Sequence, residues 1–106
     1  MFARKVSMRL KPGGAAEFKQ KVDTDVIPVL RKQKGFLDEI TFLYLSGKEV
    51  HTFSLWETAE DAEAYNREAY AGVAKLLVSV IEGVPRVQTY EVLNSSFHRI
   101  AAATAV

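Results

Sequence analysis

The chain has 106 residues, the size of one domain, because two cores of half that size would bury too little surface to fold. Its 14 basic and 13 acidic side chains leave a formal charge of +1 without a basic cluster, so no nucleic-acid partner is expected. The lack of cysteine excludes a disulfide framework and a thiolate nucleophile, and no apolar run suits a signal peptide or a membrane span. We therefore expect one cytoplasmic domain with no membrane partner.

The first predicted element is a strand at the N-terminus. Its apolar residues share one parity and are Phe2, Val6, Met8 and Leu10. Alternation of period two is typical of a strand with one buried face. The basic residues Arg4, Lys5 and Arg9 fall on both parities, so they predict no basic patch. The KPGG sequence at residues 11–14 then ends the strand in a turn.

A helix is predicted from Ala15 onward. Its apolar residues lie four apart, at Phe18, Val22, Val26 and Leu30. Pro28 predicts a kink or break near Asp23 to Ile27, because an interior proline removes a hydrogen bond and costs a helix ~3 kcal/mol. Asp23, Thr24 or Asp25 could cap a second segment. Gly35 follows a basic last turn and is expected to end the helix in a left-handed conformation.

The next two strands are predicted as a hairpin. Phe36 to Leu45 and Val50 to Trp56 are rich in aromatic and β-branched residues, and the Ser46-Gly47-Lys48 sequence between them favours a tight turn. Both strands carry large apolar residues on both parities. A sheet with one wet face would alternate more cleanly, so both faces of this sheet are expected to be covered.

The second helix begins directly after this hairpin. Thr58 and Asp61 have the spacing of a capping box, and the helical pattern that follows is expected to bend at Gly72 and end by Gly83. A fourth strand is predicted over Val84 to Leu93, with Pro85 tolerated only near its start. Residues 1–94 then form the domain, and residues 95–106 a tail that is partly disordered or docked on a partner chain.

The β-α-β-β-α-β order predicts a ferredoxin-like α+β fold. In that fold four antiparallel strands, with strands one and three central, carry both helices on one face. The other face is left bare, although the strands are apolar on both sides. A second copy of the chain is the expected cover, which predicts a homodimer closed through the sheet faces.

The sequence resembles the antibiotic biosynthesis monooxygenase type of the dimeric α+β barrel superfamily. The resemblance spans about Phe2 to Leu93. It rests on the first strand running into Lys11-Pro12-Gly13, the Lys34-Gly35-Phe36 step, and Phe53-Ser54-Leu55-Trp56-Glu57 before the second helix. It implies cofactor-free oxidation of aromatic polyketides or quinols, haem degradation, or no catalysis at all.

The haem-degrading branch can be compared position by position. Its strand asparagine, helix tryptophan and iron-binding histidine correspond here to Val6, Tyr65 and a small residue near Ala74. Haem degradation is therefore not expected. Of the polar set in the cofactor-free monooxygenases, Trp56 is the residue that the resemblance carries over.

Several side chains are candidates for a ligand pocket between the sheet and the second helix. Trp56 could stack on an aromatic ligand or close the core, and His51 could be a general base or an exposed strand residue without a carboxylate partner. Parity places Ser54 and Trp56 on one face and His51 on the other, and we favour the Trp56 face for the site. Tyr65 has core spacing, while Asn66 and Tyr70, four apart, could share a pocket-facing side.

No metal or cofactor is expected. The two histidines lie 47 positions apart without companion ligands, and the glycine-containing turn lacks the full phosphate-binding spacing. Two functions remain open: a cofactor-free monooxygenase acting on an aromatic or quinol-type molecule, and a non-catalytic homodimer that binds a small hydrophobic ligand. A basic side chain in the Trp56 cavity would favour the first, and a cavity filled by side chains the second.

Overall fold

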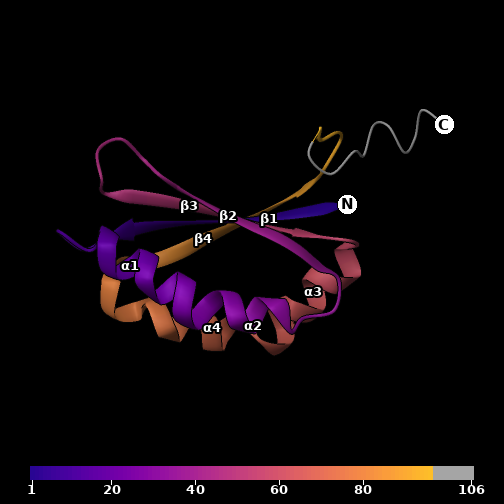
Figure 1. Cartoon of the computed structure of the whole chain (residues 1–106), viewed down its shortest axis with the longest axis horizontal. Coiled ribbons are helices and arrows are strands. Elements are labelled where there is room, and N and C mark those ends of the chain that lie inside the picture. Colours follow the sequence, from indigo (N-terminus) through magenta and orange to yellow (C-terminus); the bar gives the residue numbers. More distant parts are fainter. Residues whose placement is uncertain (97–106) are drawn as a thin grey trace.

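The computed structural model describes residues 1–96 and shows a four-stranded antiparallel sheet with order β2-β3-β1-β4. The strands are β1 (Phe2–Leu10), β2 (Phe36–Leu43), β3 (Glu49–Trp56) and β4 (Ile81–Glu91). Every helix lies on one side of this sheet (Figure 1). The ferredoxin-like fold and the central position of strands one and three are confirmed. Most of the expected tail, including Phe97 and Ile100, lies outside the described residues.

A bulge in β2 changes which of its side chains share a face. Phe36 pairs with Trp56, but the register then shifts so that Asp38 pairs with Leu55. An extra residue in one strand turns all later side chains to the other face. Phe36 therefore packs against Trp56 on the helix side, whereas Ile40 and Phe42 face away from the helices. The strand ends at Leu43 rather than Leu45.

The last strand starts three residues earlier than predicted, at Ile81, and ends at Glu91. Pro85 therefore lies well inside β4 instead of at its start. The β1–β4 register breaks between Ser7 and Arg9, which leaves the segment around Pro85 outside the regular ladder. A bulge on an edge strand tolerates a residue without an amide hydrogen, and this explains the error in the predicted boundary.

The first helical layer contains the predicted irregularity before Pro28. It consists of α1 (Ala15–Lys21), the π-helical segment η1 (Val22–Val26) and α2 (Ile27–Arg31), and the Ile27 amide donates to the Val22 carbonyl five residues back. A widened turn relieves the clash that a proline causes in a regular helix. None of the three expected capping residues caps α2, since the chain passes through without leaving helical conformation.

The second helical layer is interrupted at Ala69 and not at Gly72. It consists of α3 (Ala59–Glu68), α4 (Tyr70–Leu77) and the 3₁₀ turn η2 (Val78–Val80). Thr58 caps α3 as predicted, its hydroxyl accepting from the Asp61 amide at 3.1 Å. Ala69 has φ −128° and ψ −25°, which is outside the helical region and changes the direction of the chain just before Tyr70.

The two sheet faces have different environments. The helix side carries the core, whose buried members include Val6, Leu10, Phe18, Val50, Trp56 and Val80. The opposite side, here called the open face, has no helix over it in the described part of the chain (Figure 1). Within residues 1–96 no helix is long and apolar enough to cross a membrane, and the cytoplasmic location stays a prediction.

Candidate functional site

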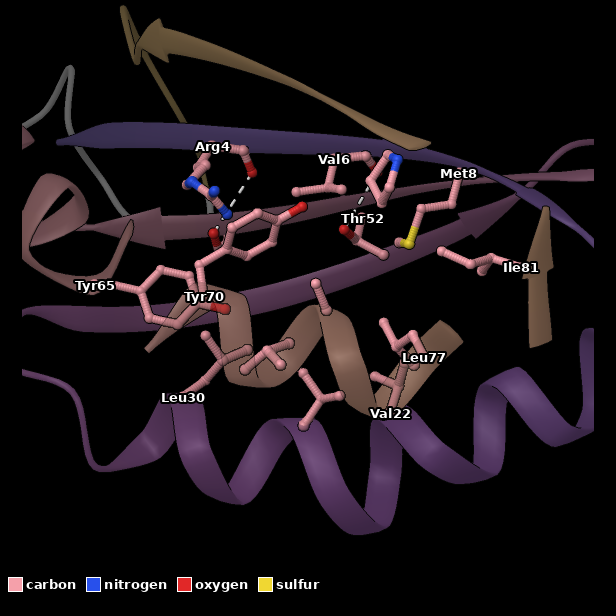
Figure 2. A pocket seen from close by; sticks show the side chains of 15 residues that line it. Arg4, Val6, Met8, Val22, Leu30, Thr52, Tyr65, Tyr70, Leu77 and Ile81 are labelled. Atoms are coloured by element: carbon pink, nitrogen blue, oxygen red, sulfur yellow. Dashed lines mark hydrogen bonds between the residues drawn. The ribbon is translucent and has the colours of Figure 1, made fainter. Parts of the chain in front are cut away.

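A small cavity lies between the sheet and the helical layer. Its volume is about 50 Å³, and its walls come from β1, β3, β4, the η1–α2 segment, α3 and α4. Figure 2 shows Arg4, Tyr65 and Tyr70 gathered at one end, while Met8, Leu77 and Ile81 lie toward the other. The cavity therefore has a cationic, aromatic end and an aliphatic end, and it lies on the Trp56 face of β3 that parity favoured.

Arg4 is the charged group of this cavity. Arg4 is only 3% exposed, and its Nη2 donates to Asn66 Oδ1 at 2.7 Å. The guanidinium carbon lies 4.0 Å from the centre of the Tyr70 ring and 5.3 Å from that of Tyr65. Cations are attracted to aromatic faces over such distances, and more strongly when water is excluded. Three residues of the second helical layer thus hold one buried cation.

No carboxylate forms an ion pair with Arg4 among residues 1–96. Burial lowers the pKa of Arg4, with the two tyrosines acting in the opposite direction, but a guanidinium remains protonated at neutral pH. A buried charge without a counter-ion has lost its hydration and gained little in return. An anion placed beside Arg4 would restore that balance.

The hydroxyl groups of the cavity supply neutral polarity. Burial raises the pKa of Tyr65 to about 12, an effect that nearby Arg4 only partly opposes. Tyr65 is therefore a neutral hydroxyl at physiological pH and no base. Thr52 Oγ1 donates to the Val6 carbonyl at 3.3 Å, and Ser54 Oγ donates to the Arg4 carbonyl at 3.5 Å. Apart from the tyrosines, Arg4 is the only ionisable lining residue found in this cavity of the described chain.

Trp56 lies behind the cavity and is not one of its walls. Its ring is fully buried, stacks on Tyr65 with centroids 5.1 Å apart, and donates from Nε1 to Ser54 Oγ at 2.9 Å. Its burial agrees with the core role, one of the two roles left open, and Trp56 is not among the residues that line this cavity; direct contact of Trp56 with a ligand stays a prediction. Trp56 instead fixes the position of Tyr65 and Ser54, which do line the cavity.

His51 lies on the open face, as its parity predicted, and therefore outside the cavity. The expected lack of a carboxylate partner was wrong, because residues two apart in a strand share a face. His51 Nε2 lies 3.6 Å from Glu49 Oε1, and Nδ1 lies 3.1 Å from Ser7 Oγ. This polar row continues to Arg86, whose Nη2 lies 3.4 Å from the same Glu49 oxygen.

A second hollow lies on the other side of Arg4. It measures about 150 Å³ and lies between α3 and β4, with Asn66 and Glu63 on one side and Val87 and Thr89 on the other. Arg4 lines both this outer hollow and the inner cavity. It is the lining residue that the two hollows share.

Wider, open grooves elsewhere on the described chain differ from this cavity. One of about 490 Å³ runs between α1 and β2 and contains Glu39, a carboxyl whose pKa is raised by burial. It is an open groove with acidic and basic groups at its rim, including Lys19 and Asp23, which pair with each other at 2.6 Å. Glu39 is outside any ion pair in the described chain, but it is a carboxyl that accepts from Thr41 Oγ1 at 2.6 Å, and the groove contains no buried cation. We therefore place the candidate site at Arg4.

The sequence already indicates that Arg4 has an unusual environment, although Arg4 was not among the predicted site residues. Arg4 has the same parity as the apolar side chains Phe2, Val6 and Met8 of β1. A charged residue on the buried parity of a central strand requires a special environment. Asn66 and Tyr70 do share a side, as their spacing predicted, but Tyr65 contacts the same guanidinium because the sheet brings Arg4 beneath all three.

Within residues 1–96 no group of three or more histidine, aspartate or glutamate side chains is arranged to hold a metal ion. The expected independence from metals and cofactors stays a prediction.

Solved structures that share the fold include two oxygenases and a protein of unknown function. A monooxygenase from the gene ActVA-Orf6 of Streptomyces coelicolor, solved with nanaomycin D, superimposes with a TM-score of 0.73 at 19% identity, over 89% of this chain and 88% of that one. SnoaB of Streptomyces nogalater, a cofactor-independent oxygenase, gives 0.72 at 11% identity, over 90% and 95%. A protein of unknown function from Nitrosomonas europaea, NE2512, gives 0.72 at 17% identity, over 90% and 91%.

At these identities the likeness concerns the fold alone. No curated protein matches the sequence. The sequence profile of the family described as antibiotic biosynthesis monooxygenase matches residues 1–76, which is more than half of the chain. The chain therefore belongs to the antibiotic biosynthesis monooxygenase family.

Proposed function

We propose that the protein binds an electron-rich aromatic molecule as its phenolate, with the oxygen anion beside Arg4, and oxidises it with dioxygen without a cofactor. The observation that carries this proposal is the buried Arg4 cation, which has no carboxylate partner in the described chain and sits under two aromatic rings. A phenolate matches both features, because its charge pairs with the guanidinium and its ring extends the aromatic cluster.

The reaction balances without an added reductant. A phenolate can transfer one electron to dioxygen, and the resulting superoxide and phenoxyl radical can join at a ring carbon that carries hydrogen. Loss of that ring proton with cleavage of the O–O bond forms a second carbonyl and releases hydroxide, which becomes water. The sum is a phenol and O₂ giving a quinone and H₂O. Arg4 stabilises the phenolate form that donates the electron, and the closed cavity excludes competing water.

The cavity offers no general base for the phenolic proton. Tyr65 is neutral over the physiological range because its pKa is raised to about 12, and Arg4 is a cation. The substrate therefore loses its proton to solvent before or during binding. The pH dependence of the rate should follow the acidity of the substrate rather than that of a protein side chain.

Two structural neighbours support the oxygenase proposal. The S. coelicolor protein is described as a monooxygenase and was solved with nanaomycin D, and the S. nogalater protein is described as a cofactor-independent oxygenase. The direct test is oxygen uptake with a panel of dihydroxynaphthalenes and other quinols, corrected for autoxidation with the heat-denatured protein. The proposal expects protein-dependent O₂ uptake with one oxygen atom of O₂ in the quinone product and the other in water, whereas simple dehydrogenation of a quinol would release hydrogen peroxide. No uptake above that control with any quinol would contradict it.

One observation favours the second candidate, a non-catalytic binding protein. The inner cavity has a free volume of only about 50 Å³, because the surrounding side chains occupy most of the space. Ligand pockets typically measure ~300–1,000 Å³. A ligand must therefore displace side chains to enter. Saturable quinol binding without oxygen uptake would identify the protein as this kind of binder.

We further propose that two copies pack through their open faces. This surface carries exposed apolar side chains on β2 and β4, among them Ile40, Phe42 and Tyr90. Phe42 packs edge-to-face on the partly buried Phe53 of β3, with ring centroids 5.8 Å apart. Contiguous apolar surface of this kind is usually covered by a partner. A second copy is a natural cover, because a two-fold axis pairs the patch with itself.

Leu55 and Leu43 provide a matched test of this dimer. Leu55 alternates with buried Trp56 and lies on the open face, whereas Leu43 lines the groove on the helix side and is half-exposed. Leu55→Glu should convert the dimer to a monomer, because an unpaired carboxylate would be buried at the interface. Leu43→Glu adds the same charge and should leave the mass measured by analytical ultracentrifugation unchanged. A monomeric wild-type protein at micromolar concentration would overturn the proposal.

A further inference from the structure

We propose that Asn66 is the residue that sets the charge preference of this site, holding Arg4 across the ligand entrance until a ligand anion replaces it. This inference rests on the proposed function, since it concerns how the same cation is presented to a phenolate. It adds a route of entry, between α3 and β4, and a residue that decides which ligands Arg4 accepts.

Arg4 lines two hollows. The inner cavity of about 50 Å³ and the outer hollow of about 150 Å³ share Arg4 as a lining residue, and Asn66 belongs to the outer one. Neither hollow alone approaches the ~300 Å³ of a small ligand pocket. A ligand that moves the Arg4 side chain joins the two, so the route into the inner cavity passes the Arg4–Asn66 hydrogen bond.

The hydrogen bond between Arg4 and Asn66 joins a cation to a neutral acceptor. Asn66 Oδ1 accepts from Arg4 Nη2 at 2.7 Å, and Asn66 is an exposed residue on α3. An amide oxygen satisfies one guanidinium donor but carries no charge, so the cation stays uncompensated. A phenolate oxygen is a stronger acceptor for the same donor, because charge-assisted hydrogen bonds are about twice as strong as neutral ones. Exchange of the amide for the ligand is therefore favourable only when the ligand is an anion.

A carboxylate in place of the Asn66 amide would pair with Arg4. Asp has the shape of Asn, so Asn66→Asp would place an anion at hydrogen-bond distance from Arg4 and form a permanent ion pair. The ligand anion would then have to break that pair and face a like charge. Glu63, which also lines the outer hollow, forms no ion pair with Arg4 in the described chain. In the wild-type protein no carboxylate of the described chain therefore competes with a ligand anion for Arg4.

The test compares 4-nitrophenolate with 4-nitroanisole, its neutral methyl ether, as ligands of the intact protein. The wild-type protein should prefer the phenolate. Asn66→Asp should weaken phenolate binding about tenfold or more and leave anisole binding unchanged, whereas Asn66→Ser should keep the preference for the anion. Arg67→Gln is the matched control, because it changes the net charge of α3 by the same amount at a neighbouring position away from the Arg4 contacts.

The possible outcomes separate the two proposals. If wild-type protein shows no preference for the phenolate, the anion site at Arg4 is wrong and this inference falls with it. If wild-type protein prefers the phenolate and Asn66→Asp retains that preference, the role of Asn66 alone is overturned. An equal loss in Arg67→Gln would also overturn it, since a general field effect would then suffice. Circular dichroism and the melting temperature show whether each variant is folded.

Discussion

Replacing Arg4 by glutamine should weaken the binding of 4-nitrophenolate by about thirtyfold or more. Removing one partner of a buried, hydrogen-bonded charge pair costs ~2–5 kcal/mol, and ~2 kcal/mol corresponds to that factor. Oxygen uptake with any quinol substrate should fall at least as far, because the electron donor is the phenolate that Arg4 stabilises. Isothermal titration calorimetry and an oxygen electrode measure the two effects.

Stability should respond to this site in the opposite direction. Arg4 is a buried cation that forms no ion pair in the described chain, so Arg4→Met, which keeps an unbranched side chain, should melt at a temperature no lower than the wild type. A folded Arg4→Met protein that still binds the phenolate with wild-type affinity would remove Arg4 from the site. A variant that unfolds would show that Arg4 is structural, with its contacts to Tyr65, Tyr70 and Asn66 outweighing the burial of its charge.

Trp56→Ala should destabilise the fold by ~3–5 kcal/mol, the usual cost of truncating a fully buried aromatic side chain. The ring is 0% exposed and packs between Phe36 and Tyr65, so its loss leaves a cavity that three elements cannot close. Trp56→Phe keeps a ring but loses the hydrogen bond to Ser54, and should cost ~1–2 kcal/mol. Urea denaturation of both variants measures these values.

Tyr44→Ala is the control for the tryptophan series. Tyr44 is 61% exposed, and its truncation should change the free energy of unfolding by no more than ~0.5 kcal/mol. Trp56→Phe should also weaken phenolate binding less than Arg4→Gln does, because Trp56 acts on the cavity only through Tyr65 and Ser54. A Trp56→Phe protein of wild-type stability that had lost ligand binding would show that Trp56 contacts the ligand directly.

Most of the fold follows from local patterns in the sequence. Thr58 with Asp61 and the alternation in β1 each depend on interactions within a few residues, and both formed where they were expected. Such local patterns predict structure reliably because the two interacting residues lie close together in the sequence. The expected glycine cap was wrong, because α2 ends at Arg31 with Lys32 as its cap. Gly35 lies in the turn directly before β2, where it has φ +78° and where a side chain would overlap the Asp61 carboxylate.

The errors arise where partners are distant in the sequence. The bulge in β2 depends on how Phe36 meets Trp56 across the hairpin, and the start of β4 depends on a register break opposite Ser7. The site shows the same limit: Arg4 and Asn66 are 62 positions apart, and only the pairing of β1 with β3 brings the strand under α3. Tyr65, Asn66 and Tyr70 were found as candidates, but the cation that unites them was not.

The acidity of a bound phenol tests the account most directly. The pKa of 4-nitrophenol can be read from its visible absorbance while it is bound, and Tyr65 does not interfere because its own pKa is raised to about 12. An apolar cavity without a charge would raise the pKa of the phenol, whereas a buried guanidinium beside its oxygen would lower it. We predict a pKa below the solution value for the wild-type complex and above it for Arg4→Gln. A raised pKa in the wild-type complex would contradict the proposal that Arg4 receives a ligand anion.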